Sequence, residues 1–216
     1  MKYISDDYHD YVFKDGKHIG LYDEMYKYSK EIPWHQDKMA FEWYSQIGIL
    51  MIRDVVKERG IPFSKILELG SGLGFFVSQL EPYGDKLYGC DVSATAAGKA
   101  RKLHKSVDFF CWDICKEQES RETYELVIMV EVMWYVLDHL ENIKNNVLSL
   151  IPNGGFFLFK QSFPDLKTSF LGKEIFPNPK SILDFWNDLE IINYCETKRL
   201  LEGDGPHIWF LGRKPI

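Results

Sequence analysis

Three glycines and two carboxylates are spaced as in a site that binds a nucleoside. Glu68 lies near the end of an apolar run, and the glycines follow it in KILELGSGLGFF as Gly70, Gly72 and Gly74. Glycine has no Cβ, so it lets the backbone turn sharply and lets a ligand approach closely. Asp91, in YGCDVS, comes 17 residues after Gly74. That is close to the spacing at which an acid binds ribose hydroxyls.

A third acid extends the pattern. Asp113 ends the apolar stretch FFCWD, where the amino group of an adenine could be bound. Each acid alone is a common residue at the end of a strand, and a glycine-rich turn can simply connect a strand to a helix. Acids at the ends of three successive predicted strands make the nucleoside interpretation the stronger one.

The glycine spacing narrows the class of nucleotide. A dinucleotide loop reads Gly-x-Gly-x-x-Gly, but Phe75 stands where its last glycine would be. A Walker loop needs Gly-Lys-Ser/Thr after its glycines, and this loop has none. We therefore expect a nucleoside that lacks phosphates.

Alternating strands and helices would position these residues. Apolar runs predict strands at 65–69, 86–91, 107–113, 124–132 and 154–161, and amphipathic patterns predict helices at 21–29, 38–59, 74–83, 94–105, 137–151 and 179–188. Continuous apolar strands that alternate with helices indicate a parallel sheet covered on both faces. Residues 190–200 and 207–214, joined by LEGDGP, predict a final antiparallel hairpin. The fold class is therefore α/β and Rossmann-like, with one reversed strand at the end of the sheet.

The chain of 216 residues, 45% of them hydrophobic, suffices for one sizeable core. We expect residues 1–37 to form an N-terminal cap or lid and residues 38–216 the main domain. Residues 162–179 interrupt the alternation and read as an insertion.

Composition excludes several classes of partner. The net charge is −6 with no basic stripe, so we expect no nucleic-acid partner. The acidic, aromatic N-terminus does not resemble a signal peptide, and no stretch predicts a membrane span. The four cysteines predict reduced, mostly buried thiols in a cytoplasmic protein, and the six histidines show no metal-ligand spacing, so we expect no metal.

Taken together, ILELGSGLG, GCDVS, FFCWDI, YELVIMVEV and LIPNGGFFLF resemble the class I S-adenosylmethionine-dependent methyltransferases. The resemblance covers residues 65–161 and implies a seven-stranded sheet whose last strand is antiparallel, with S-adenosylmethionine as cofactor. It also implies the residues that bind this cofactor. They are Glu68, Gly70, Gly72 and Gly74 at the methionine end, Asp91 at the ribose, Val92, Asp113 and Ile114 at the adenine, and Glu131 beside the methyl donor.

A looser resemblance involves DGKHIGLYDEMYKYSKEIPWH and FKQSFPDLKTSFLGKEIF. These stretches are similar to small bacterial methyltransferases of surface-polysaccharide or other sugar-linked biosynthesis. The expected reaction is methyl transfer to an oxygen or nitrogen of a small polar acceptor, such as a sugar or a phosphorylated small molecule.

Methyl transfer needs an aligned acceptor, exclusion of water and, for some acceptors, a base. Aromatic rings can stabilise a sulfonium by cation–π attraction, and Trp34, Trp134 and Tyr135 are candidates. Plain packing is the alternative for each. The candidate bases are His207, then His139 and His35, listed in order of preference. Gln161, at the end of the fifth strand, could hydrogen-bond a polar acceptor. A positioned amine acceptor could react without a base.

We expect the acceptor pocket to come from outside the sheet. The aromatic residues of the N-terminal segment and of the insertion could line a lid, or could simply attach these segments to the sheet. They are Tyr22, Tyr26, Trp34, Phe163, Phe170 and Phe176. Two other functions remain open: an aminopropyltransferase or other nucleoside-dependent enzyme on the same fold, and a non-catalytic S-adenosylmethionine-binding protein. The sequence leaves the acceptor and the oligomeric state open.

Overall fold

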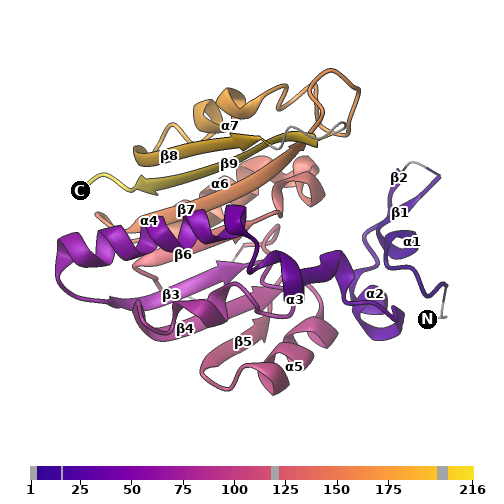
Figure 1. Ribbon diagram of the computed structural model, residues 1–216, viewed down its shortest axis with the longest axis horizontal. Helices are drawn as coiled ribbons and strands as arrows, with labels where there is room; N and C mark the ends of the chain where they lie inside the picture. The colour runs from indigo at the N-terminus through magenta and orange to yellow at the C-terminus, as the bar shows by residue number, and fades with distance from the viewer. Residues whose placement is uncertain (1–3, 16, 118–121, 199–203) are drawn as a thin grey trace.

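A seven-stranded sheet forms the centre of the molecule (Figure 1). The structure is a computed structural model that describes residues 4–15, 17–117, 122–198 and 204–216. The strand order across the sheet is β5-β4-β3-β6-β7-β9-β8. The strands are β3 (Phe63–Leu69), β4 (Gly84–Asp91), β5 (Val107–Cys111), β6 (Leu126–Val130), β7 (Phe156–Pro164), β8 (Glu190–Lys198) and β9 (Asp204–Arg213).

Strand directions confirm the predicted fold class. Strands β3 to β7 pair in parallel, and β9 runs antiparallel to both β7 and β8. The reversed strand lies one place inside the edge of the sheet rather than at its end. The burial of the two strands fits this strand order. Residues 208–211 of β9 are all buried, whereas residues of β8 alternate between exposed and half-buried. The more apolar strand takes the inner place, and β8 becomes the edge.

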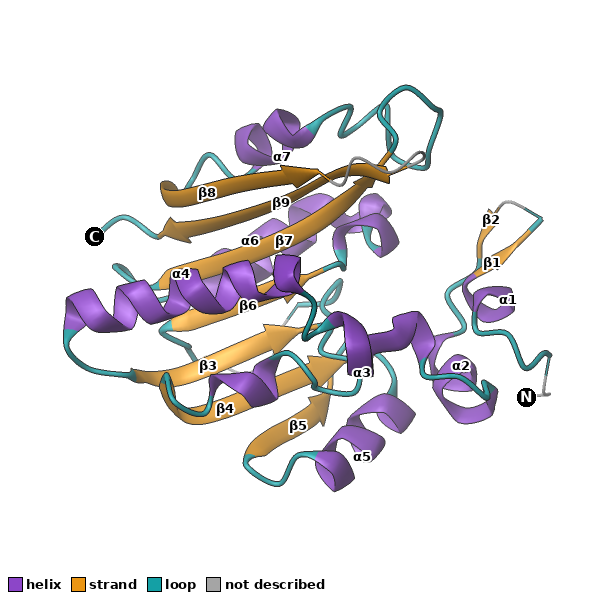
Figure 2. Ribbon diagram, viewed as in Figure 1, coloured by secondary structure: helices purple, strands orange, loops and turns teal. Residues whose placement is uncertain are grey.

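Helices cover both faces of the sheet, as predicted (Figure 2). Helices α4 (Trp43–Arg59) and α5 (Ala94–Leu103) pack on one face together with the short 3₁₀ helix η2 (Val77–Leu80). Helices α6 (Leu140–Leu150) and α7 (Pro179–Phe185) pack on the other. Each face therefore has its own apolar core.

The N-terminal elements lie beyond the carboxyl ends of the parallel strands, where the strand arrows point in Figure 1. They are α1 (His9–Val12), β1 (Phe13–Lys14), β2 (Lys17–His18), α2 (Tyr22–Tyr28), η1 (Pro33–His35) and α3 (Gln36–Met39). Tyr11, Met25 and Tyr26 are buried in a small cluster that includes Leu73 and Ala96 of the main domain. The N-terminal segment, residues 4–15 and 17–39, thus packs on the end of the sheet that carries the predicted site. The helix predicted at 21–29 is present as α2.

Two predicted helices are wrong in extent. The helix predicted at 38–59 is broken between α3 and α4, where Ser45 Oγ and Gln46 Nε2 donate to the Met39 and Ala40 carbonyls. The helix predicted at 74–83 is only the single turn η2. Just before it, the Gly72 and Leu73 N–H groups donate to Asp91 and Gln36, and within it the Val77 N–H donates to Glu68. The predicted helix at 94–105 is present as α5, and the one at 137–151 as the 3₁₀ helix η4 (Leu137–His139) followed by α6.

The insertion predicted at 162–179 begins inside the sheet, because β7 continues to Pro164. The end hairpin is present as β8 and β9, although residues 199–203 of its predicted strand and turn lie outside the described residues. One short 3₁₀ helix, η3 (Met133–Tyr135), follows β6.

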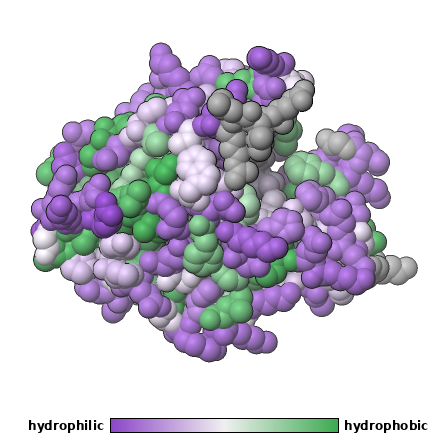
Figure 3. All heavy atoms as spheres, viewed as in Figure 1, coloured by the Kyte–Doolittle hydropathy of each residue, from purple (hydrophilic) through white to green (hydrophobic). Residues whose placement is uncertain are grey.

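The surface of the molecule is largely polar in the view of Figure 3. Hydrophilic residues cover much of the face in Figure 3. Within the described ranges, no helix has the length and apolar character needed to cross a membrane.

All four cysteines are free, but only Cys90 is buried and Cys111 is exposed, so the prediction of mostly buried thiols is wrong. The cytoplasmic location stays a prediction.

Candidate active site

A cavity of about 550 Å³ lies at the carboxyl ends of the parallel strands. In open α/β sheets, this end is where ligands bind. Its lining includes residues from the ends of β3, β4, β6 and β7, from the loop after β5, from α4 and from the N-terminal segment. The described residues thus form one site in the place where the sequence predicts one.

The glycine-rich loop after β3 turns back on itself through left-handed backbone conformations. The φ angles are +67° at Gly70, +54° at Gly72 and +80° at Gly74, a region that favours glycine. A Cβ at Gly70 would come within 2.5 Å of Val132, and one at Gly72 within 2.5 Å of Gln36. The glycines therefore permit close packing of the loop against the segments that enclose the cavity.

Asp91 fixes this loop and also faces the cavity. Its Oδ2 accepts from the Gly72 N–H and its Oδ1 from the Ser93 N–H, both at 2.9 Å. A carboxylate has about four lone-pair sites, so both oxygens can accept further bonds from ligand hydroxyls. Burial raises the pKa of Asp91 to about 6, while these two bonds favour the charged form.

Glu68 lies deeper, with 4% of its surface exposed, and lines the same cavity. Its Oε2 accepts from the Val77 N–H at 3.0 Å. Burial raises the pKa of Glu68 to about 8. This carboxyl is therefore mostly protonated at neutral pH and can donate as well as accept a hydrogen bond.

The predicted adenine-binding residues lie together at the other side of the cavity. Val92, Asp113 and Ile114 all line it. Strand β5 ends at Cys111, so Asp113 belongs to the following loop, where its Oδ1 accepts from the Cys115 N–H at 3.1 Å and its Oδ2 contacts Lys116 at 3.1 Å. Apolar walls with carboxylates at the predicted ribose and adenine positions are compatible with a nucleoside that carries no phosphate.

The N-terminal segment forms one wall of the cavity. Its lining residues are Tyr8, Tyr22, Tyr26, Trp34, His35, Gln36 and Met39. Gln36 Oε1 accepts from the Leu73 N–H at 2.9 Å, and its Nε2 donates to the Tyr26 hydroxyl at 2.8 Å.

A second attachment joins this segment to the start of α5, close to Asp91. Asp23 Oδ1 accepts from the Ser93 hydroxyl at 2.9 Å and from the Thr95 N–H at 2.8 Å. The segment is thus bonded both to the glycine-rich loop and to the turn after β4.

The aromatic candidates separate into two groups. Trp34 and Tyr135 line the cavity with ring centroids 5.5 Å apart, and burial raises the pKa of Tyr135 to about 12. Trp134 does not line it: its indole donates to the Ser162 carbonyl, and its ring packs against Phe163, Phe170 and Phe176. Those three phenylalanines are also missing from the lining, which favours the alternative that they attach the insertion to the sheet. They fill the space around Trp134 instead.

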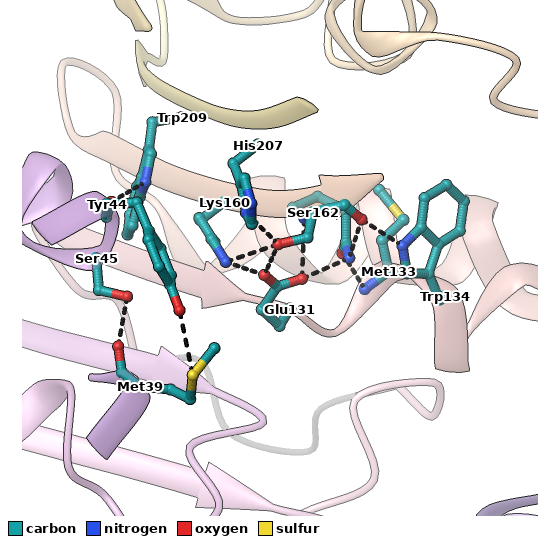
Figure 4. Close-up of polar contacts among 11 residues, drawn as sticks. Met39, Tyr44, Ser45, Glu131, Met133, Trp134, Lys160, Ser162, His207 and Trp209 are labelled. Carbon is teal, nitrogen blue, oxygen red and sulfur yellow. Dashed lines mark hydrogen bonds and ion pairs between the residues drawn. The ribbon is translucent and has the colours of Figure 1, made fainter. Parts of the chain in front are cut away.

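Polar residues from β7 surround Glu131 at the end of β6 (Figure 4). Lys160 and the Ser162 hydroxyl both donate to Glu131 Oε1. Gln161 Nε2 and the Ser162 N–H donate to Oε2 at 2.7 and 3.0 Å. Burial lowers the pKa of Lys160 to about 7, and the contact with Glu131 opposes this shift by favouring the ammonium. Gln161 is predicted to meet the acceptor; it is buried and holds Glu131 instead.

The histidine candidates do not form part of the cavity wall, except for His35. His207 is the fourth residue of β9 rather than the first, and its Nδ1 lies 2.6 Å from Ser162 Oγ. Its ring stacks on Tyr44, with centroids 4.9 Å apart. His139 is exposed, at the end of η4. The structure therefore places His207 behind the lining residues Ser162 and Tyr44, and His139 outside the site.

Several lining residues were not predicted from the sequence, among them Gln36, Tyr44, Lys160 and Ser162. Lys160 offered a signal, since a lysine in the strand FFLFKQ interrupts an apolar run. The others stand in ordinary patterns and enter the site only through tertiary packing.

Comparison with known proteins gives the family. The model of the nodulation protein S (NodS) family matches residues 23–170. The chain belongs to the NodS family. The match includes every lining residue of the cavity except Tyr8 and Tyr22. The resemblance to class I methyltransferases is thereby confirmed.

Individual relatives are distant. Nodulation protein S of Rhizobium tropici is 26% identical over 131 residues, which is 59% of this chain and 53% of that protein. Ubiquinone biosynthesis O-methyltransferase of Bradyrhizobium diazoefficiens is 32% identical over 94 residues, or 42% of this chain and 37% of that protein. This chain spans about half the length of the NodS relative and a smaller share of the length of the O-methyltransferase.

Solved structures show the same fold. N-methyltransferase NodS from Bradyrhizobium japonicum WM9, in complex with S-adenosyl-L-homocysteine, superposes with a TM-score of 0.68 at 20% identity, covering 87% of this chain and 94% of that one. TehB from Haemophilus influenzae has a TM-score of 0.59 at 17% identity, covering 83% and 66%.

Proposed function

We propose that this chain binds S-adenosylmethionine and transfers its methyl group to an oxygen or nitrogen of a small polar acceptor. The observation that carries the proposal is Asp91, which faces the cavity while it holds the glycine-rich loop. Membership of the NodS family supports it, as does the complex of a NodS structure with S-adenosyl-L-homocysteine. The cofactor, when bound, supplies an electrophilic methyl group.

The residues of the chain would bind the cofactor, orient the acceptor and enclose both. Asp91 would accept bonds from the ribose hydroxyls, and Asp113 would bind the adenine amino group. Glu68 and the glycine loop would surround the methionine end, and Trp34 and Tyr135 would offer their rings to the sulfonium. We place the acceptor beside Glu131, with the N-terminal segment closing the cavity from water.

The acceptor atom is part of the proposal. A solved relative is an N-methyltransferase, and curated relatives include O-methyltransferases. The looser sequence resemblance favours an acceptor of surface-polysaccharide or sugar-linked biosynthesis. We propose that residues 4–15 and 17–37 select it, because six of their side chains line the cavity whereas the insertion adds only Ser162.

The test has two parts. Calorimetry should show binding of S-adenosylhomocysteine, and transfer of a labelled methyl group should be measured across amino sugars, nucleotide-sugars and phosphorylated small molecules. Failure to bind the nucleoside would reject the proposed function. Binding without transfer to any acceptor would favour the non-catalytic alternative.

A further inference from the structure

Glu131 has a backbone conformation that is unusual for its residue type. Its φ angle is +58°, in the left-handed region that glutamate rarely adopts. Such a conformation costs free energy and persists only where its surroundings impose it. Here the surroundings are four hydrogen-bond donors from three successive residues of β7, two on each carboxylate oxygen. The fold therefore fixes the position of this one carboxylate.

Exposure shows which group faces the cavity. The Glu131 side chain is 37% exposed, whereas the Lys160 side chain is 3% exposed. Lys160 Nζ contacts Glu131 and Ser162 and lies 5.3 Å from the centre of the Tyr44 ring. The positive charge is thus enclosed by protein, and a ligand would meet the carboxylate.

The position along the sheet separates this carboxylate from the nucleoside acids. Asp91 and Asp113 follow β4 and β5, on one side of β3, and Glu131 follows β6, on the other side. Glu68 stands on β3 between them. A nucleoside bound by Asp91 and Asp113 would direct its methionine end past Glu68 toward Glu131.

We propose that Glu131 binds the reacting amine or hydroxyl group of the methyl acceptor, and that Lys160 is a positioning residue that holds the carboxylate. This inference rests on the proposed function. The acceptor's lone pair forms a bond to the methyl carbon while the carbon–sulfur bond breaks and leaves its electron pair on sulfur. The positive charge passes to the acceptor atom, next to Glu131, and the proton of that atom is then lost to water. A fixed carboxylate stabilises this charge.

The inference restricts the class of acceptor. An amine or hydroxyl can donate a hydrogen bond to Glu131 in place of one of its four present donors, whereas a carboxylate acceptor has no proton to donate. One relative is named as a malonyl-[acyl-carrier protein] O-methyltransferase. We infer that this chain does not methylate carboxylates.

A nucleoside probe tests the inference without a known acceptor. Sinefungin carries an amino-bearing carbon in place of the methyl-bearing sulfur, so its ammonium would lie next to Glu131. Calorimetry on the full chain should show that sinefungin binds about tenfold or more tightly than S-adenosylhomocysteine, as expected for a charge-assisted hydrogen bond. In Glu131→Gln the affinities for sinefungin and S-adenosylhomocysteine should agree within about twofold.

Controls keep the outcome decisive. Glu141→Gln, at an exposed position of α6, should retain the sinefungin preference. Because Glu131→Gln leaves Lys160 buried and unpaired, the double variant Glu131→Gln/Lys160→Met provides a second, neutral form of the site. Lys160→Met alone should reduce the preference while S-adenosylhomocysteine still binds, and Lys160→Arg should restore part of it.

Equal affinity of the wild-type protein for the two nucleosides would overturn the inference and leave the proposed function standing. A sinefungin preference that survives in both Glu131 variants would also overturn it. If the wild-type protein binds neither sinefungin nor S-adenosylhomocysteine, the proposed function is rejected and the inference with it.

Discussion

The Asp91 carboxylate accepts a hydrogen bond from the backbone N–H of Gly72 at 2.9 Å, so the acid at the end of β4 holds the loop that follows β3. The same carboxylate bonds Ser93 at the start of α5 and lines the cavity. One side chain therefore organises two loops and is also expected to bind ligand. Its removal should change both the stability of the protein and its affinity for a nucleoside.

We expect Asp91→Ala to weaken binding of S-adenosylhomocysteine by about 1–3 kcal/mol, because polar groups of loop and ligand lose their partner. The midpoint of thermal unfolding should also fall. Calorimetry and a thermal melt on one preparation measure both. Asp108→Ala, at an exposed position of β5, is the control and should change neither. Unchanged affinity in a folded Asp91→Ala protein would contradict the ribose assignment.

Gly72→Ala should displace the N-terminal segment. A Cβ there would lie 2.5 Å from Gln36 Oε1 and 2.6 Å from the Tyr26 hydroxyl, at a φ of +54°. We expect a loss of about 1–3 kcal/mol in the free energy of unfolding and faster proteolysis of the N-terminal segment. Gly98→Ala is the matched control, since a Cβ at Gly98 in α5 meets nothing within 4 Å. It should leave stability equal or raise it by up to about 1 kcal/mol.

Glu68 should make stability depend on pH. Its folded pKa, about 8, lies above the ordinary value of 4.5, so the folded protein holds the proton more tightly. The contribution of Glu68 is therefore complete below pH 4.5 and is lost as pH rises to 8. Glu68→Gln mimics the protonated form and should be more stable than wild type by roughly 2–5 kcal/mol at pH 8, with little difference at pH 5. Denaturant melts at the two pH values measure this, and parallel curves would reject the role of burial.

His207 is expected to act through its neighbours. It lies behind Ser162 and Tyr44, so His207→Ala should lower methyl transfer by about tenfold or less, rather than the 10²–10⁴ of a lost general base. Affinity for S-adenosylhomocysteine should be unchanged. A larger loss, together with disappearance of the acidic limb of the pH–rate profile, would restore His207 as the base.

Much of the fold could be predicted because its signals are local. Continuous apolar runs identify β3, β4, β6 and β7, and the short return before residue 207 identifies the hairpin. The helix predicted at 74–83 is only one turn long: the Val77 N–H donates to Glu68, and the loop just before it is held by bonds from Gly72 to Asp91 and from Leu73 to Gln36. The hydrophobic pattern of the loop itself does not predict these hydrogen bonds to other elements.

The cofactor residues could be predicted because one loop and successive strand ends carry them. The residues on the acceptor side of the cavity could not be predicted in this way. Lys160 and Ser162 meet Glu131 only because β7 pairs with β6, and Tyr44 enters the cavity only because α4 crosses the sheet. The preference for histidines as bases came from residue type, which does not say whether a side chain reaches the cavity.

Tyr44 is built into the framework of the protein. Its carbonyl accepts from the Trp209 indole at 2.7 Å, and the same indole packs against Gly48 so closely that a Cβ there would lie 2.3 Å from the ring. This wall of the cavity is thus continuous with the core between α4 and β9, and its shape cannot vary without cost to folding. The wall from the N-terminal segment is attached through a few hydrogen bonds and one small apolar cluster. Divergence or engineering of acceptor preference should therefore proceed by exchange of the N-terminal wall, with the α4 wall retained.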